Sequence, residues 1–351
     1  MKYSTALTLA AISSLLTACG GSGNDTSSGS GSFSLGVSDN PANVNGVTIA
    51  FNQVVLKGVN GTTGTFSLDV ASGGQPSQVD LLTVTGSAIE PLITGQTIPT
   101  GDYQLCIYML NDETGAAGTS FVETNTPSVE GLTTNSNGSC GGTGATDPAT
   151  GRLFFNQSFT IASGNNNFVA EFNLEKGLLS PRGSNTFWTL KPTSVQLVNT
   201  TEVGAISGTL STTLVDDCHA AAGTAGAVTF ADRVYLYPGA AGVDDPQADP
   251  AIKSMVDFRA SADVAATQVA PIAAARAEPV TDGGSTVTGY SYELGFVVAG
   301  EYSLGFTCLA QNDDADTVDQ AADSEPFFLT DAAGPITVSA DATTTQNLPA
   351  N

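Results

Sequence analysis

The sequence has 351 residues, with 34 acidic and 10 basic side chains and a formal net charge of −24 at neutral pH. So acidic a chain excludes nucleic acid as a natural partner, because its phosphates would be repelled, and it weakens attraction to anionic lipid headgroups. The chain is longer than a domain with a single hydrophobic core usually is, which predicts two domains. The 39 glycines, with frequent Thr, Val and Ser, favour strands over helices.

The N-terminus has the pattern of a bacterial export signal. Lys2 precedes an apolar stretch over 6–16, which is too short to span a bilayer. Residues 16–19, Leu-Thr-Ala-Cys, resemble the bacterial lipobox. The resemblance implies that residues 1–18 are a cleaved lipoprotein signal peptide and that Cys19 carries the lipid, a diacylglycerol plus a third, palmitate-like chain. Several acyl chains give a stable membrane anchor.

The residues after Cys19 bear on location. Gly20 stands where an aspartate would favour retention in the inner membrane, so we expect the outer membrane, with periplasmic and surface-facing orientations both open. Residues 19–32 form a Gly/Ser-rich segment without apolar residues to bury. Such a composition predicts a flexible tether.

Four cysteines follow the tether, and an even number in an exported protein usually forms disulfides. Of the three pairings, we expect Cys106–Cys140 and Cys218–Cys308, because each bond then stays inside one predicted domain. The alternative, a zinc site, is poorly supported: the cysteines form no CxxC pair, and His219 is the sole histidine.

The remaining chain reads as short segments of alternating polarity bounded by turn residues, which predicts strands. The pattern is clear over 102–110, where Tyr103, Leu105, Ile107 and Met109 share one face. The expected strands of the first domain lie at 33–37, 47–58, 65–70, 102–110, 152–161, 167–175 and 187–198. Those of the second domain lie at 205–215, 233–238, 289–298, 301–309 and 335–340.

Between these strands the sequence predicts less regular features. A short helix is expected within 79–93, and the Ala-rich stretch 257–278 could be helical, although Pro271 interrupts it. Residues 111–150 have the composition of a long loop that Cys140 would pin. The boundary falls near 200–204. The sequence therefore predicts an all-β protein of two sandwich-like domains, 33–203 and 204–351.

One pattern occurs in both domains: "IPTGDYQLC" at 98–106 and "VVAGEYSLGFTC" at 297–308. Each places a glycine and an acid before a tyrosine, whose ring should pack inward while its hydroxyl stays near the strand edge. The second copy resembles the strand–turn–strand of transthyretin-like (prealbumin-like) β-sandwiches. That resemblance implies an accessory or binding module.

The first domain resembles a more specific family. Four blocks, at 32–58, 79–86, 98–109 and 187–198, occur in the order found in a bacterial lipoprotein domain of unknown function catalogued as family four-three-eight-two. The resemblance implies an all-β module of the cell envelope without an established reaction. No catalytic residue can be carried over from it.

The sequence contains few residues or motifs that are typical of catalytic sites. The GxSxG, P-loop and HExxH motifs are absent. His219 is expected on a loop beside the disulfide, and Trp188 in the core. Paired-carboxylate chemistry on a glycan stays open, although no pair of acids stands out.

The acidic stretch 312–325 is a candidate cation site. Asn312, Asp314 and Asp316 offer oxygen ligands at alternate positions, and Asp323 or Glu325 would close a calcium site. The alternative is a solvated acidic loop.

Together these features favour a non-catalytic, lipid-anchored envelope protein that presents β-domains for binding or assembly. Its expected partners are the membrane, through the lipid, and an envelope protein or glycan. No cofactor is expected apart from calcium. The alternatives are a calcium-dependent adhesion module and a carboxylate-based enzyme acting on polysaccharide.

Overall fold

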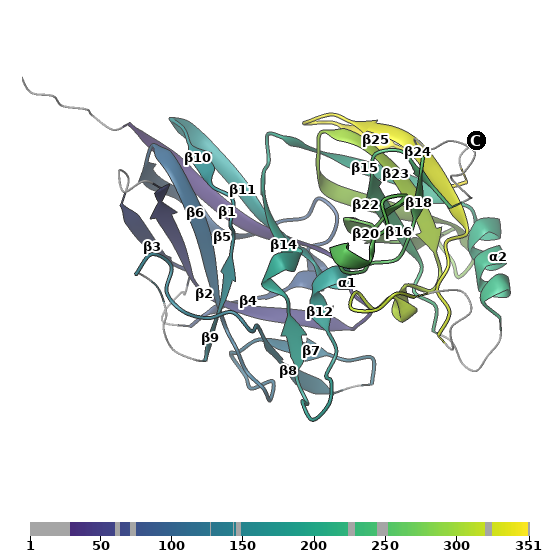
Figure 1. Ribbon diagram of the computed structural model, residues 1–351, viewed down its shortest axis with the longest axis horizontal. Helices are drawn as coiled ribbons and strands as arrows, with labels where there is room; N and C mark the ends of the chain where they lie inside the picture. The colour runs from purple at the N-terminus through teal and green to yellow at the C-terminus, as the bar shows by residue number, and fades with distance from the viewer. Residues whose placement is uncertain are drawn as a thin grey trace, which may run out of the picture.

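The chain folds into two β-domains that lie side by side, the N-terminal one in purple to teal and the C-terminal one in green to yellow (Figure 1). The computed structural model describes residues 29–59, 64–70, 75–126, 128–142, 144, 149–223, 229–243, 252–319 and 325–349. Strands dominate these residues, so the predicted all-β class is confirmed. The signal peptide, Cys19 and most of the tether lie outside the described residues.

The first sheet of the N-terminal domain has four strands in the order β14-β11-β1-β5. Strand β1 lies parallel to β11 and antiparallel to β5, and β14 lies antiparallel to β11. The strands are β1 (Ser30–Asn40), β5 (Glu90–Pro99), β11 (Gly164–Asn173) and β14 (Val195–Asn199).

The second sheet is built around β2, which pairs with β6 and β7 on one side and with β3 and β4 on the other. Its strands are β2 (Gly46–Gly58), β3 (Thr65–Asp69), β4 (Ser77–Asp80), β6 (Gly101–Leu110), β7 (Phe121–Glu123), β8 (Val129–Thr133), β9 (Thr150–Phe154), β10 (Phe159–Ile161), β12 (Leu178–Leu179) and β13 (Trp188–Leu190). The rings of Phe51 on β2 and Phe172 on β11 meet edge to face, with centroids 6.1 Å apart. The core therefore lies between the two sheets.

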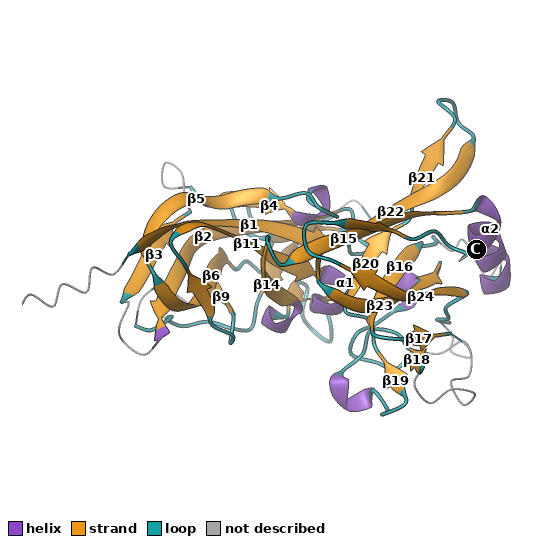
Figure 2. Cartoon of the chain, turned by 90° about the horizontal axis from the view of Figure 1, so that it is seen from above, coloured by secondary structure: helices purple, strands orange, loops and turns teal. Residues whose placement is uncertain are grey.

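The C-terminal domain contains two four-stranded sheets and a small parallel sheet. The first, in the order β21-β22-β15-β25, comprises β15 (Val203–Leu210), β21 (Glu278–Thr281), β22 (Val287–Val298) and β25 (Thr343–Thr345). The second, in the order β20-β16-β23-β24, comprises β16 (Arg233–Pro238), β20 (Ala273–Arg276), β23 (Gly300–Thr307) and β24 (Asp331–Val338). The small sheet comprises β17 (Ala241–Gly242), β18 (Lys253–Met255) and β19 (Gln268–Val269). Figure 2 shows the β21–β22 hairpin projecting beyond the body of this domain.

Helices are few among the described residues. They are α1 (Leu174–Gly177), α2 (Thr212–Ala222) and the 3-10 turns η2 (Leu81–Thr83), η3 (Pro192–Ser194), η5 (Ser261–Asp263) and η6 (Ala310–Asn312). The short helix expected within 79–93 is the single turn η2, which the Asp80 side chain caps. None of the described helices has the length and hydropathy to cross a membrane.

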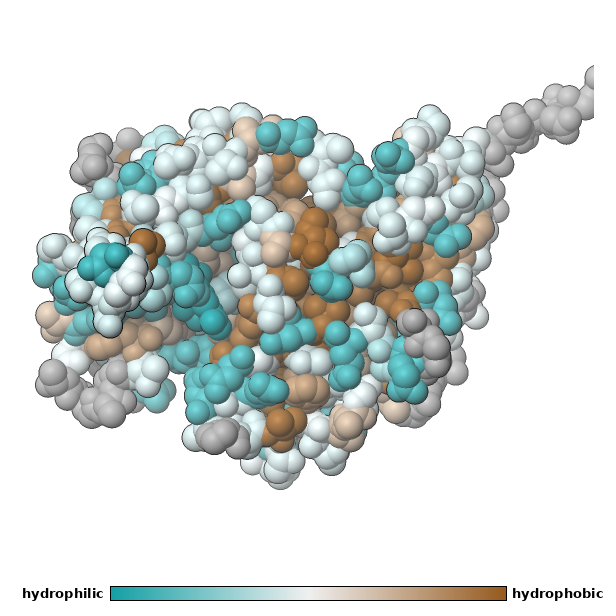
Figure 3. Space-filling model, turned by 180° about the vertical axis from the view of Figure 1, so that it is seen from behind, coloured by the Kyte–Doolittle hydropathy of each residue, from teal (hydrophilic) through white to brown (hydrophobic). Residues whose placement is uncertain are grey.

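Figure 3 shows hydrophobic residues gathered over the N-terminal domain on the rear face.

Three expectations about local structure were wrong. The strand expected over 205–215 ends at Leu210, and α2 follows because Ser211 Oγ accepts the amide of Leu214 and caps a helix. The stretch 257–278 is not helical and instead supplies η5, β19 and β20. The loop expected over 111–150 contains the β7–β8 hairpin.

The repeated tyrosine pattern has the same geometry in both domains. The Tyr103 hydroxyl donates to the carbonyl of Pro99, and that of Tyr302 to the carbonyl of Val298, both at 2.8 Å. Both rings are buried, as predicted. In each domain the tyrosine strand leads to a cysteine, and the two disulfides are the expected ones, Cys106–Cys140 and Cys218–Cys308.

Candidate functional site

A buried ion pair lies where the two domains meet. Arg233 on β16 of the C-terminal domain directs Nε to Oε1 of Glu175 on α1 of the N-terminal domain, at 3.0 Å, and both side chains are 6% exposed. Arg233 and Arg276 also donate to the carbonyl oxygen of Ala42, at 3.4 and 2.7 Å. Because buried charges require partners in fixed positions, these contacts define how the domains are oriented.

A second set of ion pairs lies nearer the surface of the same junction. Arg182 of the N-terminal domain contacts Asp314 at 2.6 Å and Asp316 at 3.0 Å, and Lys191 also contacts Asp316. The chain has only 10 basic residues against 34 acidic ones. Placing several of them at this junction gives part of the acidic loop a role in joining the domains.

These contacts bear on the predicted calcium ligands. Asp314 and Asp316 are engaged by the N-terminal domain, and the Asn312 side chain donates to the carbonyl of Pro326 at 2.8 Å. Asp323 lies outside the described residues. The cation site formed by these four residues stays a prediction.

A cavity of about 370 Å³ opens between the domains beside these ion pairs. Both domains line it, with Glu175 and Trp188 on one side and Asp313 and Glu325 on the other. The indole nitrogen of Trp188 donates to Glu130 at 2.8 Å, and the ring packs against the N-terminal core. Trp188 is therefore only partly buried: it packs against the core in which the sequence predicts it, and it also lines the cavity.

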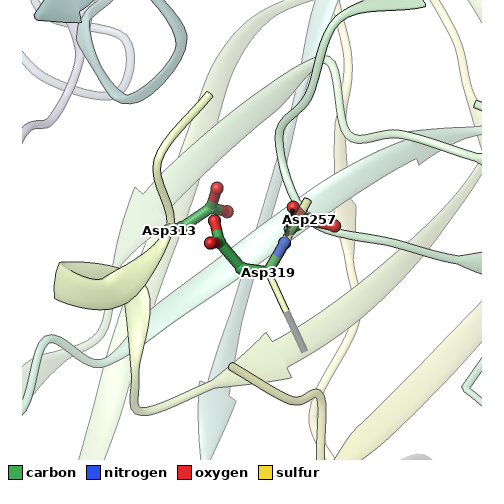
Figure 4. Close-up of side chains that lie close together, drawn as sticks. All are labelled: Asp257, Asp313 and Asp319. Atoms are coloured by element: carbon green, nitrogen blue, oxygen red, sulfur yellow. Dashed lines mark hydrogen bonds between the residues drawn. The ribbon is translucent and has the colours of Figure 1, made fainter. Parts of the chain in front are cut away.

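A group of three carboxylates lies within the C-terminal domain next to this cavity. Asp257 follows β18, whereas Asp313 and Asp319 flank the turn after η6. One oxygen from each carboxylate lies within 4.8 Å of one from each of the others, and Figure 4 shows the groups gathered together. We call these three residues the carboxylate cluster. It shares the acidic loop with the predicted calcium ligands but contains none of them.

Hydrogen bonds hold the cluster in place. Asp257, which is 1% exposed, accepts the backbone amide of Asp319 through Oδ2 at 3.0 Å. Asp313 accepts the Tyr235 hydroxyl at 2.8 Å and the Phe258 amide at 3.1 Å, both through Oδ2. Its Oδ1 is buried and has no hydrogen-bond partner among the described residues.

The charges of the cluster are incompletely balanced. The guanidinium of Arg259 pairs with Oδ1 of Asp257 and supplies one positive charge for three carboxylates. Burial raises the pKa of Asp313 well above its usual range, and the nearby charges of Glu175 and Asp319 raise it further. The cluster can therefore take up positive charge, as a proton or as a cation.

Residues 30–192 match the family model described as "Domain of unknown function (DUF4382)". These residues form a DUF4382 domain. The four sequence blocks had indicated this family, and the match confirms it. No curated protein matches the chain.

The similar solved structures include a leucine-rich repeat protein from Bacteroides thetaiotaomicron, at 11% identity and a TM-score of 0.21, covering 92% of this chain. This chain spans 26% of that protein's length. A putative adhesin from Bacteroides ovatus matches at 11% identity and a TM-score of 0.17. The match covers 96% of this chain and 100% of the adhesin chain. A putative cell adhesion protein from Bacteroides fragilis matches at 9% identity and a TM-score of 0.19. The match covers 90% of this chain and 91% of that protein's chain. The transthyretin-like resemblance of the C-terminal domain stays a prediction.

His219 lies outside the DUF4382 domain, on α2 rather than on the expected loop. Its ring stacks on Phe230 with centroids 3.9 Å apart, and Nε2 lies 2.8 Å from Oδ1 of Asp232. These contacts fix the end of α2 against the segment that leads into β16.

Within the DUF4382 domain, Glu171 on β11 is a buried acid with an unusual pKa. Asn40 donates to Oε1 at 3.0 Å and Gln196 donates to Oε2, yet burial outweighs both and raises the pKa of Glu171 to about 7. An unfolded glutamate titrates near 4.5, so between these values the folded state holds more protons. Stability should therefore fall as the pH rises from 4.5 to 7 and level off above that.

We expect Glu171→Gln to remove this part of the pH dependence. The effect amounts to about 3 kcal/mol at most, at about 1.4 kcal/mol per pKa unit. Urea unfolding at pH 5 and pH 8 measures it, and the matched control is Glu301→Gln, which changes an exposed glutamate near the start of β23. Parallel stability profiles for the wild-type protein and Glu171→Gln would contradict this assignment.

Proposed function

We propose that this protein is a non-catalytic, lipid-anchored protein of the bacterial outer membrane that presents its two β-domains as one rigid unit to an envelope protein or glycan. The observation that carries the proposal is the buried Arg233–Glu175 ion pair, which locks the DUF4382 domain onto the C-terminal domain.

The rest of the chain supports this role. The lipobox-like residues 16–19 and the Gly/Ser-rich segment 19–32 provide an anchor and a tether. The sequence contains a single histidine, so hydrolases that need a histidine base have at most one candidate residue.

The anchor is tested with the full chain produced in a Gram-negative host and labelled with radioactive palmitate. We expect the wild-type protein to incorporate label and to sediment with the outer membrane on a density gradient. The Cys19→Ala variant should stay unlabelled and leave the membrane fraction. Equal labelling of the two proteins, or recovery of the labelled protein in the inner membrane, would refute the proposed anchoring.

The non-catalytic role is tested by incubating the same purified protein with envelope polysaccharides and measuring the release of reducing ends. We expect no release above that of a heat-denatured sample, together with retention of one polysaccharide or envelope protein on immobilised protein. Release that disappears when a single acid is replaced would establish the carboxylate-based enzyme instead.

A further inference from the structure

We propose that Asp257, Asp313 and Asp319 bind one divalent cation, with Ca²⁺ as the best fit. This site lies inside the C-terminal domain and is independent of the anchoring and binding roles proposed above. It also differs from the cation site that the sequence predicts, because the two sets share no residue.

The spacing of the three carboxylates suits a single ion. Calcium binds carboxylate oxygens at about 2.3–2.6 Å, so two ligands of one ion lie at most about 5 Å apart. The three oxygens lie within 4.8 Å of one another, and they come from two separate segments of the fold. Figure 4 shows the carboxyl groups of Asp313 and Asp319 turned toward one another, with Asp257 beside them.

A second observation points to a ligand. Oδ1 of Asp313 is buried and has no hydrogen-bond partner among the described residues, although Oδ2 of the same carboxyl group has two. Buried polar atoms in folded proteins nearly always have a partner, and one without a partner costs about 1–3 kcal/mol or more if it is charged. A cation at the cluster would supply the Asp313 carboxyl group with a further partner.

The charge balance selects a divalent ion. Three carboxylates and the paired Arg259 guanidinium carry a net charge of −2 when all are ionised. One Ca²⁺ neutralises this charge. Calcium also tolerates irregular coordination and accepts water as additional ligands, whereas Mg²⁺ demands a near-octahedral site.

The position of the site gives the ion a structural effect. Asp313 and Asp319 bracket Asp314 and Asp316, which pair with Arg182 and Lys191 across the domain junction. The amide of Asp314 also donates to Oδ2 of Asp319 at 2.8 Å. An ion held by the cluster would therefore fix the loop that joins the C-terminal domain to the DUF4382 domain.

The test is calcium binding by the full-length protein, purified in detergent and measured by equilibrium dialysis with ⁴⁵Ca²⁺ at constant ionic strength. We expect one bound calcium per chain that excess Mg²⁺ displaces poorly. The Asp313→Asn variant keeps the shape of the side chain and should bind at least tenfold more weakly. The matched control, Asp314→Asn, lies one residue away outside the cluster and should bind as the wild type does.

A second measurement covers the case in which Asp313→Asn fails to fold. Terbium substitutes for calcium and luminesces when a nearby aromatic ring absorbs, and Tyr235 hydrogen-bonds Asp313. We expect sensitised terbium emission from the wild-type protein, a drop of at least half in Tyr235→Phe and displacement by calcium. Absence of bound calcium at millimolar concentration would overturn the proposal. Loss of binding in Asp314→Asn but not in Asp313→Asn would overturn it too, in favour of the site predicted from Asn312, Asp314 and Asp316.

Discussion

Replacing Glu175 by alanine is expected to lower the free energy of unfolding by about 3–5 kcal/mol, because the change leaves the buried Arg233 guanidinium without its counter-charge. Arg233 cannot lose its proton, so the free-energy penalty of an unpaired buried charge remains. Its hydrogen bonds to the carbonyls of Asp232 and Ala42 remain, but they supply only partial charges. The carboxylate of Glu175 is therefore the group on which the ion pair depends.

Thermal and urea unfolding of the full chain measure this effect. Glu293→Ala is the matched control: Glu293 accepts a hydrogen bond from Ser87 across the same junction, but in an exposed position. Exposed polar contacts contribute about 0–1 kcal/mol, so this variant should be nearly as stable as the wild type. Equal losses in the two variants would show that the buried ion pair has no special role in joining the domains.

The features that the sequence predicted well depend on local pattern. Alternating polarity identified strands such as β6, and the repeated Gly-acid-Tyr pattern identified equivalent turns in the two domains. The disulfide pairing followed from the predicted domain boundary near 200–204, because each bond then stays inside one domain. The strand and turn predictions use residues close together in the chain.

The errors arose where tertiary contacts override local preference. Alanine favours helices in isolation, yet Ala273, Ala274 and Ala275 form β20. Ala273 and Ala275 face one hydrophobic core while Ala274 faces another, so the strand is buried on both sides and only small side chains fit. Nothing in the local sequence reports this double burial.

The carboxylate cluster could not be found from spacing for a related reason. The sequence suggested alternate positions of one loop, Asn312, Asp314 and Asp316, as ligands of one ion. In the structure the turn directs Asp314 and Asp316 toward the other domain, and Asp313 meets Asp257 from a distant segment. The sequence did contain one useful signal, the scarcity of basic residues. Each basic side chain that is buried or ion-paired marks a place where acidic side chains must gather.

Removing the Cys218–Cys308 bond is expected to destabilise the C-terminal domain by about 4–5 kcal/mol on the chain-entropy model. The bond links residues 90 apart in the sequence, whereas Cys106 and Cys140 are 34 apart. Since the entropy that a cross-link removes from the unfolded chain grows with loop length, the shorter loop should contribute somewhat less, about 4 kcal/mol. Both bonds are buried, so alanine replaces each cysteine without introducing a polar group.

The two bonds can be separated experimentally because Trp188, the single tryptophan, lies in the DUF4382 domain. In urea unfolding, the Cys106→Ala/Cys140→Ala variant should shift the fluorescence transition to lower urea. The Cys218→Ala/Cys308→Ala variant should mainly shift the transition seen by circular dichroism, and by more. If the Cys218/Cys308 variant instead moved both transitions equally, the domains would unfold as one cooperative unit. The contacts at the junction would then couple the unfolding of the two domains.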